Sequence, residues 1–116
     1  MSSIKLYNKT YNTNLSQSLS IFLEDDKFPP ELQYFERLNY LKVRCKNKIQ
    51  RIPDFIYDFS ELTFLDLSFN NITGNISSQF GKLTNLNTLI LKSNNLTGPI
   101  PSSLSLLGNL RNLDLS

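Results

Sequence analysis

The stretch LDLSFNNITGNI at residues 65–76 returns 24 residues later as LILKSNNLTGPI at residues 89–100. A step of 24 from Leu65 reaches Leu89 and then Leu113, and one step back reaches Leu41. A period held over several copies indicates a repeat architecture in which each copy forms one coil. One coil alone cannot bury its apolar side chains, so neighbouring coils have to stack into a continuous core.

The same register continues at other apolar positions of the chain. Within each copy the leucines alternate with other residues, which is the period of a β-strand. We therefore expect one short strand per coil, while SSQFGKL at 77–83 and SSLSLLGNL at 102–110 are expected to form short helical turns on the outer face. Further inward positions repeat in three series, which are Leu38, Leu62, Leu86 and Leu110; Phe35, Phe59, Leu83 and Leu107; and Leu32, Ile56, Phe80 and Leu104.

Two asparagines and two glycines also recur at the 24-residue spacing. Asn70 and Asn94 stand where the chain leaves the expected strand. A buried amide at that point can bond backbone groups between coils, so we expect both residues to be structural. Gly74 and Gly98 suit a tight backbone position after this turn.

The segment LNTLILKSNNLTGPIPSSLSLLGNL at 86–110 resembles the leucine-rich repeat family in its 24-residue plant-type form, LxxLxLxxNxLTGxIPxxLxxL. The segment LTFLDLSFNNITGNISSQFGKL at 62–83 departs from that pattern only at Ser77, where proline is usual. This resemblance implies an α/β repeat solenoid, a curved right-handed array with a parallel sheet on its concave side. It also implies short 3-10 or irregular segments on the convex side, and a protein-binding role like that of receptor-like, L-domain-like proteins.

The array is expected to span residues 28–116 in about four repeats, the last incomplete, after a degenerate lead-in or imperfect cap at 1–27. Within that lead-in, SLSIFL at 18–23 has the pattern of an earlier strand with Leu19 and Ile21 inward. The sequence stops at LDLS, in the middle of a strand motif, which suggests a fragment. An uncovered final strand favours self-association through the C-terminal end.

The chain lacks the residues of the common catalytic and metal sites. It has no histidine and one cysteine, Cys45, and it has no glycine-rich phosphate loop or kinase signature. Asp66 and Asp114 share one column, but two rungs separate them by about 10 Å, with Ile90 between them. Two solvated acids are favoured over a catalytic pair. We expect no enzyme activity, no cofactor and no metal.

Charge and hydropathy limit the partners. The net charge is +2, and no apolar run approaches a membrane span, so nucleic acid and a membrane span within this chain are not expected. No signal peptide is recognisable. The location is extracellular or membrane-attached if the chain belongs to a receptor-like protein, and cytoplasmic otherwise. RLNYLKVRCKNKIQR at 37–51 carries six basic residues and no acid. A solvated face is favoured there over an anion-binding surface, because acids follow nearby.

The residues between the inward leucines are the candidates for partner binding. Three columns follow from the register: Tyr40, Phe64, Thr88 and Asn112; Lys42, Asp66, Ile90 and Asp114; and Arg44, Ser68, Lys92 and Ser116. The aromatic and apolar side chains of Tyr40, Phe64, Phe69 and Ile90, mixed with both charges, favour a protein or peptide partner on the concave face. The alternative is the ectodomain of a receptor-like membrane protein, including receptor kinases. A lesser alternative is an anion-binding surface on residues 37–51.

Overall fold

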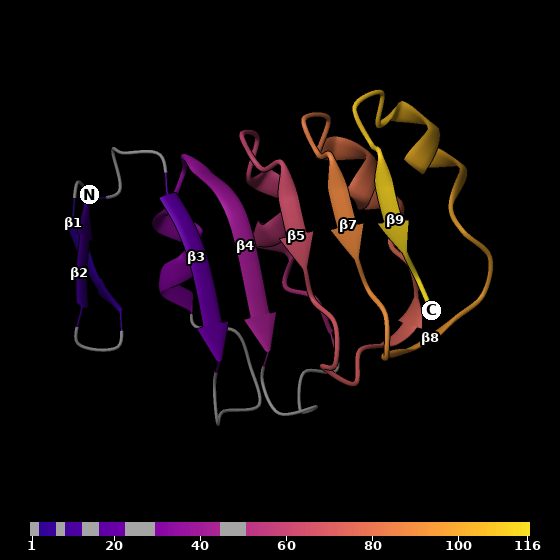
Figure 1. The fold of residues 1–116 in the computed structure, drawn as a ribbon, viewed down its shortest axis with the longest axis horizontal. Helices are drawn as coiled ribbons and strands as arrows, with labels where there is room; N and C mark the ends of the chain where they lie inside the picture. Colours follow the sequence, from indigo (N-terminus) through magenta and orange to yellow (C-terminus); the bar gives the residue numbers. More distant parts are fainter. Residues whose placement is uncertain (1–2, 7–8, 13–16, 23–29, 45–50) are drawn as a thin grey trace.

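A computed structural model of the chain describes residues 3–6, 9–12, 17–22, 30–44 and 51–116. Its main feature is one parallel sheet with short 3-10 segments behind it (Figure 1). The sheet follows chain order and contains β3 (Gln17–Phe22), β4 (Leu38–Arg44), β5 (Phe64–Asp66), β7 (Thr88–Ile90) and β9 (Asn112–Asp114). The 3-10 segments are η1 (Pro30–Tyr34), η2 (Asp54–Asp58), η3 (Ser78–Lys82) and η4 (Ser102–Leu106). This layout confirms the predicted repeat solenoid.

The 24-residue step is also the pairing register of the sheet. Leu41 lies opposite Leu65, Leu65 opposite Leu89, and Leu89 opposite Leu113. Neighbouring strands are parallel, so each coil repeats the path of the one before it. Equivalent leucines therefore lie one above another, and the predicted register is confirmed.

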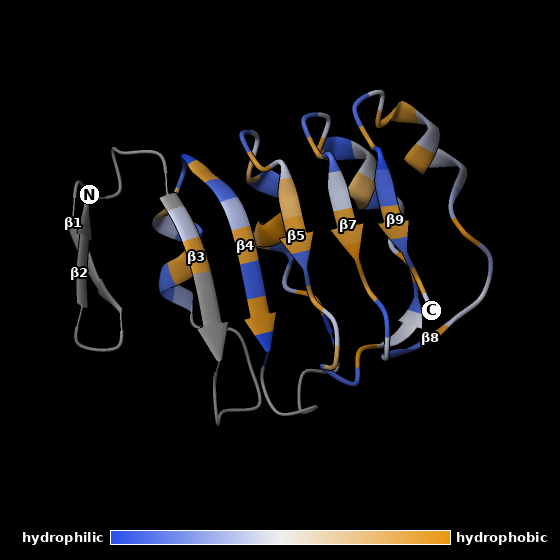
Figure 2. Ribbon diagram, in the orientation of Figure 1, coloured by the Kyte–Doolittle hydropathy of each residue, from blue (hydrophilic) through white to orange (hydrophobic). Residues whose placement is uncertain are grey.

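The core lies between the sheet and the 3-10 segments. Leu65 and Leu89 point into it from the strands, and Ile56 and Phe80 point into it from η2 and η3; all four are fully buried. Hydrophilic and hydrophobic residues alternate along β4, as expected for a strand with one buried face (Figure 2). Each fully buried side chain of this size contributes roughly 1.5–3 kcal/mol, and the stack adds such residues on every rung.

The N-terminal part begins with an antiparallel hairpin of β1 (Ser3–Leu6) and β2 (Lys9–Asn12), which the sequence did not suggest. The predicted early strand is confirmed as β3, which pairs with β4 and places Leu19 opposite Leu41. Leu19 is buried, whereas the side chain of Ile21 lies outside the described residues. The division of the chain at residue 28 stays a prediction.

A second, two-stranded parallel sheet joins adjacent coils beside the main sheet. It contains β6 (Thr73–Asn75) and β8 (Asn95–Thr97). Gly74 and Gly98, at their expected tight positions, have φ values of 83° and 79° in the left-handed region. The glycines thus let each coil turn away from the main sheet and pair with the next coil.

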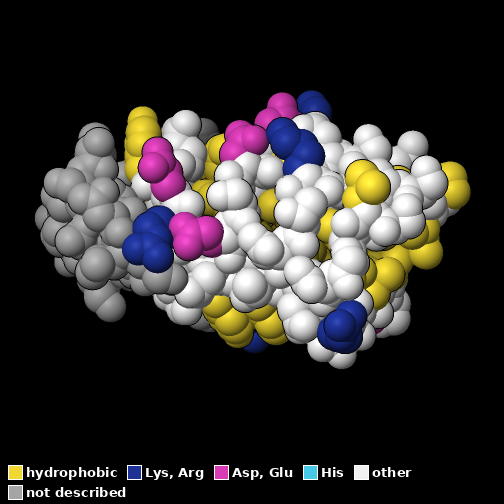
Figure 3. Space-filling view, turned by 90° about the horizontal axis from the view of Figure 1, so that it is seen from above, with side chains coloured by type: hydrophobic (Ala, Val, Ile, Leu, Met, Phe, Trp, Pro, Cys, Tyr) yellow, Lys and Arg dark blue, Asp and Glu magenta, His cyan; other side chains and the backbone are white. Residues whose placement is uncertain are grey.

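At β9 the apolar column continues without the burial seen on earlier rungs. Leu113 is 42% exposed, whereas Leu65 and Leu89 in the same column are 0% exposed. Ile100 and Leu106 are exposed as well, and apolar side chains gather at this end of the molecule (Figure 3). Self-association through this end stays a prediction.

Candidate binding face on the concave sheet

The strand alternation that buries the leucines turns the residues between them to the open face of the sheet. The register aligns two of the predicted columns across β4, β5, β7 and β9. The third column continues them at the ends of the strands. The aligned columns are Tyr40, Phe64, Thr88 and Asn112, and Lys42, Asp66, Ile90 and Asp114.

The first column changes from aromatic to polar along the array. The rings of Tyr40 and Phe64 stack at 4.2 Å between centroids, with an interplanar angle of 6°. Both side chains are half-buried, so part of the stack faces solvent. On the later rungs the Asn112 amide donates to the Thr88 hydroxyl at 3.2 Å. The apolar part of the face is therefore concentrated on β4 and β5.

The acids of the second column carry structural hydrogen bonds. The Asp66 Oδ1 atom accepts from the Ser68 backbone N–H at 2.9 Å and from the Ser68 hydroxyl at 2.7 Å. Asp114 accepts the same two bonds from Ser116 at 3.1 and 2.7 Å. The hydroxyl and backbone bonds of Ser116, together with the charge of Lys92, lower the pKa of Asp114.

Burial corrects part of the sequence-based picture. Asp66, Ser68 and Thr88 are only 7%, 4% and 8% exposed. The expectation of a solvated acid at Asp66 is therefore wrong, because the turn formed with Ser68 folds its carboxylate against the strand end. Asp66 and Asp114 do stand on strands separated by β7, with Ile90 between them.

The sequence columns left out Phe69, which follows the third column on the coil of β5. Its side chain is 37% exposed, and its φ of 60° lies in the left-handed region. The Arg44 Cζ atom lies 4.6 Å from the ring centroid, and the Lys92 Nζ atom lies 5.8 Å from it. The sequence contains one signal for this residue: the equivalent position of the next repeat is Ser93, so a large aromatic side chain is not required there by the repeat.

Asn70 and Asn94 lie between coils and bond backbone groups on both sides. The Asn94 Oδ1 atom accepts from the backbone N–H groups of Asn70 at 3.0 Å and Ile72 at 2.9 Å. Its Nδ2 atom donates to the carbonyls of Leu67 at 3.0 Å and Leu91 at 2.9 Å. These side-chain amides fix the backbone that follows each strand. They therefore also hold the residues of the third column in position.

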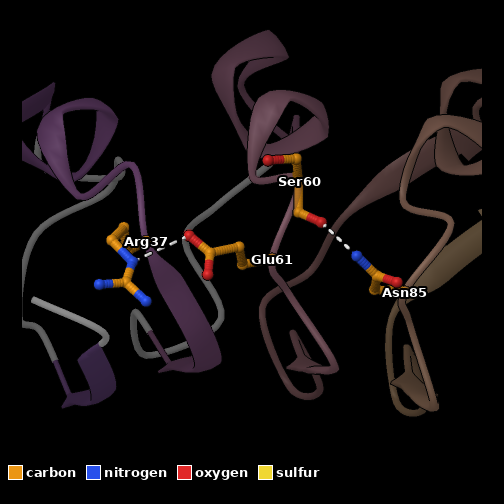
Figure 4. Close-up of polar contacts among 4 residues, drawn as sticks. All are labelled: Arg37, Ser60, Glu61 and Asn85. Atoms are coloured by element: carbon orange, nitrogen blue, oxygen red, sulfur yellow. Dashed lines mark hydrogen bonds and ion pairs between the residues drawn. The ribbon is translucent and has the colours of Figure 1, made fainter.

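The basic stretch 37–51 does not form a single surface in the part of the chain that the structure describes. Arg37 pairs with Glu61 at 3.2 Å on the edge where the strands begin, next to the bond from Asn85 to the Ser60 carbonyl (Figure 4). Seen from above, acidic and basic side chains alternate over that edge (Figure 3). Arg44 instead stands on the sheet face, while Cys45 and residues 46–50 lie outside the described residues.

One buried tyrosine lies away from the sheet face. Tyr57 packs edge-on against Phe80, with ring centroids 5.0 Å apart and an interplanar angle of 88°. Burial raises the pKa of the Tyr57 phenol, although its hydrogen bond with Ser77 acts in the opposite direction. Ser77 replaces the usual proline of the repeat, so this bond is specific to this coil.

Residues 3–6, 9–12, 17–22, 30–44 and 51–116 also bear on metal binding and on insertion into a membrane. Within these ranges no three potential metal ligands of the histidine, cysteine or carboxylate type lie together. The helices in the same ranges are all too short or too polar to cross a membrane.

Comparison with known proteins gives a consistent picture. The family described as Leucine rich repeat matches residues 60–116. A plant ice-binding protein is 31% identical with a TM-score of 0.71, over 87% of this chain and 31% of that protein. The ectodomain of the Arabidopsis thaliana membrane receptor kinase GASSHO1/SCHENGEN3, solved in complex with CASPARIAN STRIP INTEGRITY FACTOR 2, is 33% identical with a TM-score of 0.65. That match covers 83% of this chain and 11% of the ectodomain.

A second ectodomain structure from Arabidopsis thaliana is similar to the same degree. The BIR2 ectodomain from Arabidopsis thaliana is 32% identical with a TM-score of 0.64, over 87% of this chain and 53% of that structure. The chain therefore spans less than two thirds of the length of each of these proteins. No curated protein sequence matches the chain.

Proposed function

Because this chain belongs to the leucine-rich repeat family, we propose that its concave sheet face is a non-enzymatic binding surface for a protein or peptide. The observation that carries the proposal is the Tyr40–Phe64 stack, an aromatic surface that remains partly open to solvent. Aromatic side chains surrounded by charges are typical of protein recognition, because they offer large contact areas at a small cost in entropy.

The fold alone does not fix the ligand, since similar coils occur in a plant ice-binding protein and in receptor ectodomains. The side chains on the face favour a peptide or protein. Lys42, Ile90 and Lys92 are half-buried residues of the same columns, so apolar and charged groups are offered together. Nine of the twelve column residues contribute here, while Asp66, Ser68 and Thr88 are buried.

A selection of random displayed peptides against the whole chain tests this function. The selected peptides are compared on Phe64→Ala, which removes the aromatic platform, and on Leu106→Ala as a matched control. Leu106 is exposed on η4, behind the sheet. We expect Phe64→Ala to weaken binding by about tenfold or more, as for a central aromatic contact, and Leu106→Ala to leave it unchanged. The reverse pattern, or equal effects of the two substitutions, would refute the concave site.

The second candidate is the same binding face within the ectodomain of a receptor-like membrane protein. The similarity to two Arabidopsis thaliana ectodomains favours it, one of them from a membrane receptor kinase and solved with a bound factor. An extracellular or membrane-attached location would accompany this function. Sequencing of the full transcript separates the two candidates, because a receptor requires a secretion signal and a membrane span outside the described coils.

A further inference from the structure

Phe69 is held in an unusual position for an aromatic residue. Its positive φ is uncommon for a residue with a bulky side chain. Its backbone N–H donates to the Lys92 carbonyl at 3.2 Å, which fixes the residue to the next coil. The ring is thus kept at the surface, while Asn70, the next residue, points inward and is fully buried. A fixed, exposed ring on a binding face indicates a contact residue.

Two cations approach this ring from the coils on either side. Arg44 comes from the end of β4 and Lys92 follows β7, and both lie within the range of a cation–π interaction. Among the residues that the structure describes, neither cation forms an ion pair. The carboxylate of Asp66 on the coil of this ring is buried and bonded to Ser68. The carboxylate of Asp114 accepts two bonds from Ser116, which lower its pKa, and it is near enough to Lys92 for that charge to lower the pKa further without an ion pair between them. Two like charges beside one ring therefore favour an anionic group brought by a partner.

Arg44 ends β4 and Lys92 follows β7, whereas the aromatic stack lies closer to the start of β4 and at the start of β5. Tyr40 precedes Arg44 by four residues on β4. Four residues of strand cover about 13 Å. An extended peptide lying along the strand direction spans that length in about four of its own residues, and residues four apart in an extended chain point to the same side.

We propose that the concave face recognises an extended acidic peptide through two contacts. An aromatic or apolar side chain of the peptide packs on Tyr40 and Phe64, and an Asp or Glu four residues away binds between Arg44 and Lys92 over Phe69. This rests on the proposed function and adds the charge and spacing of the partner. A polyanion such as RNA or heparin fits less well, because Asp114 and the carboxylate of Asp66 lie in the column between the two contacts.

The test uses a capped nonapeptide, acetyl-Ser-Thr-Trp-Ser-Thr-Ser-Asp-Thr-Ser-amide, whose only charge is the aspartate. Binding to the whole isotope-labelled chain is measured by NMR titration. One comparison peptide carries Asn in place of Asp, and another carries the Asp two residues from the Trp. We expect the first peptide to bind about fivefold more tightly than either, the size of an exposed ion-pair contribution. The amide signals of Arg44, Phe69 and Lys92 should shift with the first peptide.

Variants of the protein locate the effect. Arg44→Gln and Lys92→Gln should each remove most of the preference for Asp over Asn, and Phe69→Leu should reduce it while keeping an apolar side chain. Lys82→Gln is the matched control, because Lys82 pairs with Asp58 on η2, away from the sheet face. A preference that survives in the first two variants, or that is lost in Lys82→Gln, would overturn the inference.

The outcomes also separate this inference from the proposed function. If the Asp and Asn peptides bind equally and Phe64→Ala weakens both, the acidic contact is refuted and the concave binding face stands. If none of the peptides shifts the concave signals, the inference is refuted, and the random-peptide selection decides the function independently. If a heparin oligosaccharide shifts the same signals more strongly than the Asp peptide, the site responds to charge alone and peptide recognition is refuted.

Discussion

Replacing Asn94 by leucine tests whether the asparagine amides hold the coils together. Leucine has a similar volume but no hydrogen-bonding group. The substitution leaves the backbone N–H groups of Asn70 and Ile72 without their acceptor, and the Leu91 carbonyl without its donor. The carbonyls of Leu67 and Lys92 also lose a bond, but each keeps a donor. These donors are the Asn70 side chain at 2.9 Å and the Phe69 N–H at 3.2 Å. Three backbone groups are therefore most affected, two of them donors.

The expected loss follows from these contacts. Each unsatisfied buried group costs about 1–3 kcal/mol. Asn94 is only half-buried, so water can reach part of the site and reduce the total. We expect Asn94→Leu to lower the free energy of unfolding by about 2–4 kcal/mol. Asn85→Leu is the control: Asn85 is exposed and makes a single bond, to the Ser60 carbonyl (Figure 4), so its loss should stay near about 0.5 kcal/mol.

Urea unfolding gives the total, and amide hydrogen exchange gives the location. In Asn94→Leu the amides of Asn70 and Ile72 should exchange faster than those of the strands, since they have lost their acceptor. The reasoning fails if the leucine variant is as stable as the parent and the two amides keep their protection. It also fails if Asn85→Leu is equally destabilising, because the effect would then not depend on the set of bonds that the Asn94 amide makes.

Four shorter predictions concern the core, the packing of coils, pH and assembly. Leu89→Ala should lower the free energy of unfolding by about 2–5 kcal/mol, as for other buried leucine truncations; an unchanged urea midpoint would contradict the register. Gly81→Ala should be destabilising by about 1–3 kcal/mol, because the added Cβ atom would lie 2.9 Å from the Ser103 carbonyl oxygen. Gly108→Ala is the control: a Cβ atom added there has no other atom within 4 Å, so the stability should not change in the same assay. Burial raises the pKa of the Tyr57 phenol in the folded state. The resulting contribution to stability is present below the unfolded tyrosine pKa of about 10 and is lost as the pH rises through the folded pKa. Urea unfolding from about pH 8 to 11 should show this loss of stability, and Tyr57→Phe should make the loss smaller. Residues 1–116 expressed alone should self-associate at high concentration through the β9 edge and exposed Leu113. A single monomeric species of this polypeptide in sedimentation would contradict the prediction.

The core could be predicted from the sequence because its rules are local and periodic. A strand places every second residue on one side, and a fixed repeat length places equivalent residues in register. Leu65 and Leu89 are therefore readable as core positions without any knowledge of the neighbouring coils. The same logic gave the side of the sheet on which Phe64 and Ile90 lie, and it gave the short turns behind the sheet.

Other features depend on how two coils meet, and no single repeat contains that information. The sheet of β6 and β8 forms because the segments after the asparagines come within bonding distance, as in the 2.8 Å bond from the Asn95 N–H to the Ile72 carbonyl. The burial of Asp66 follows from a short-range bond to Ser68, which the column pattern did not suggest. The cations beside the Phe69 ring come from other coils: Arg44 lies 25 positions before Phe69 in the sequence, and Lys92 lies 23 positions after it.

The small residue between the two cations explains why they can share one ring. Arg44, Ser68 and Lys92 occupy equivalent places on successive coils, and only Ser68 is buried. The Ser68 hydroxyl bonds to Asp66, and this small side chain stays buried between the coils that carry the two longer ones. A long cation in that place would stand about 5 Å from each of the others, the spacing of adjacent strands, and would repel both. The repeat thus fixes the positions of these side chains. The alternation of long and small residues along the third column separates the two cations, and an acidic side chain of a partner can bridge them.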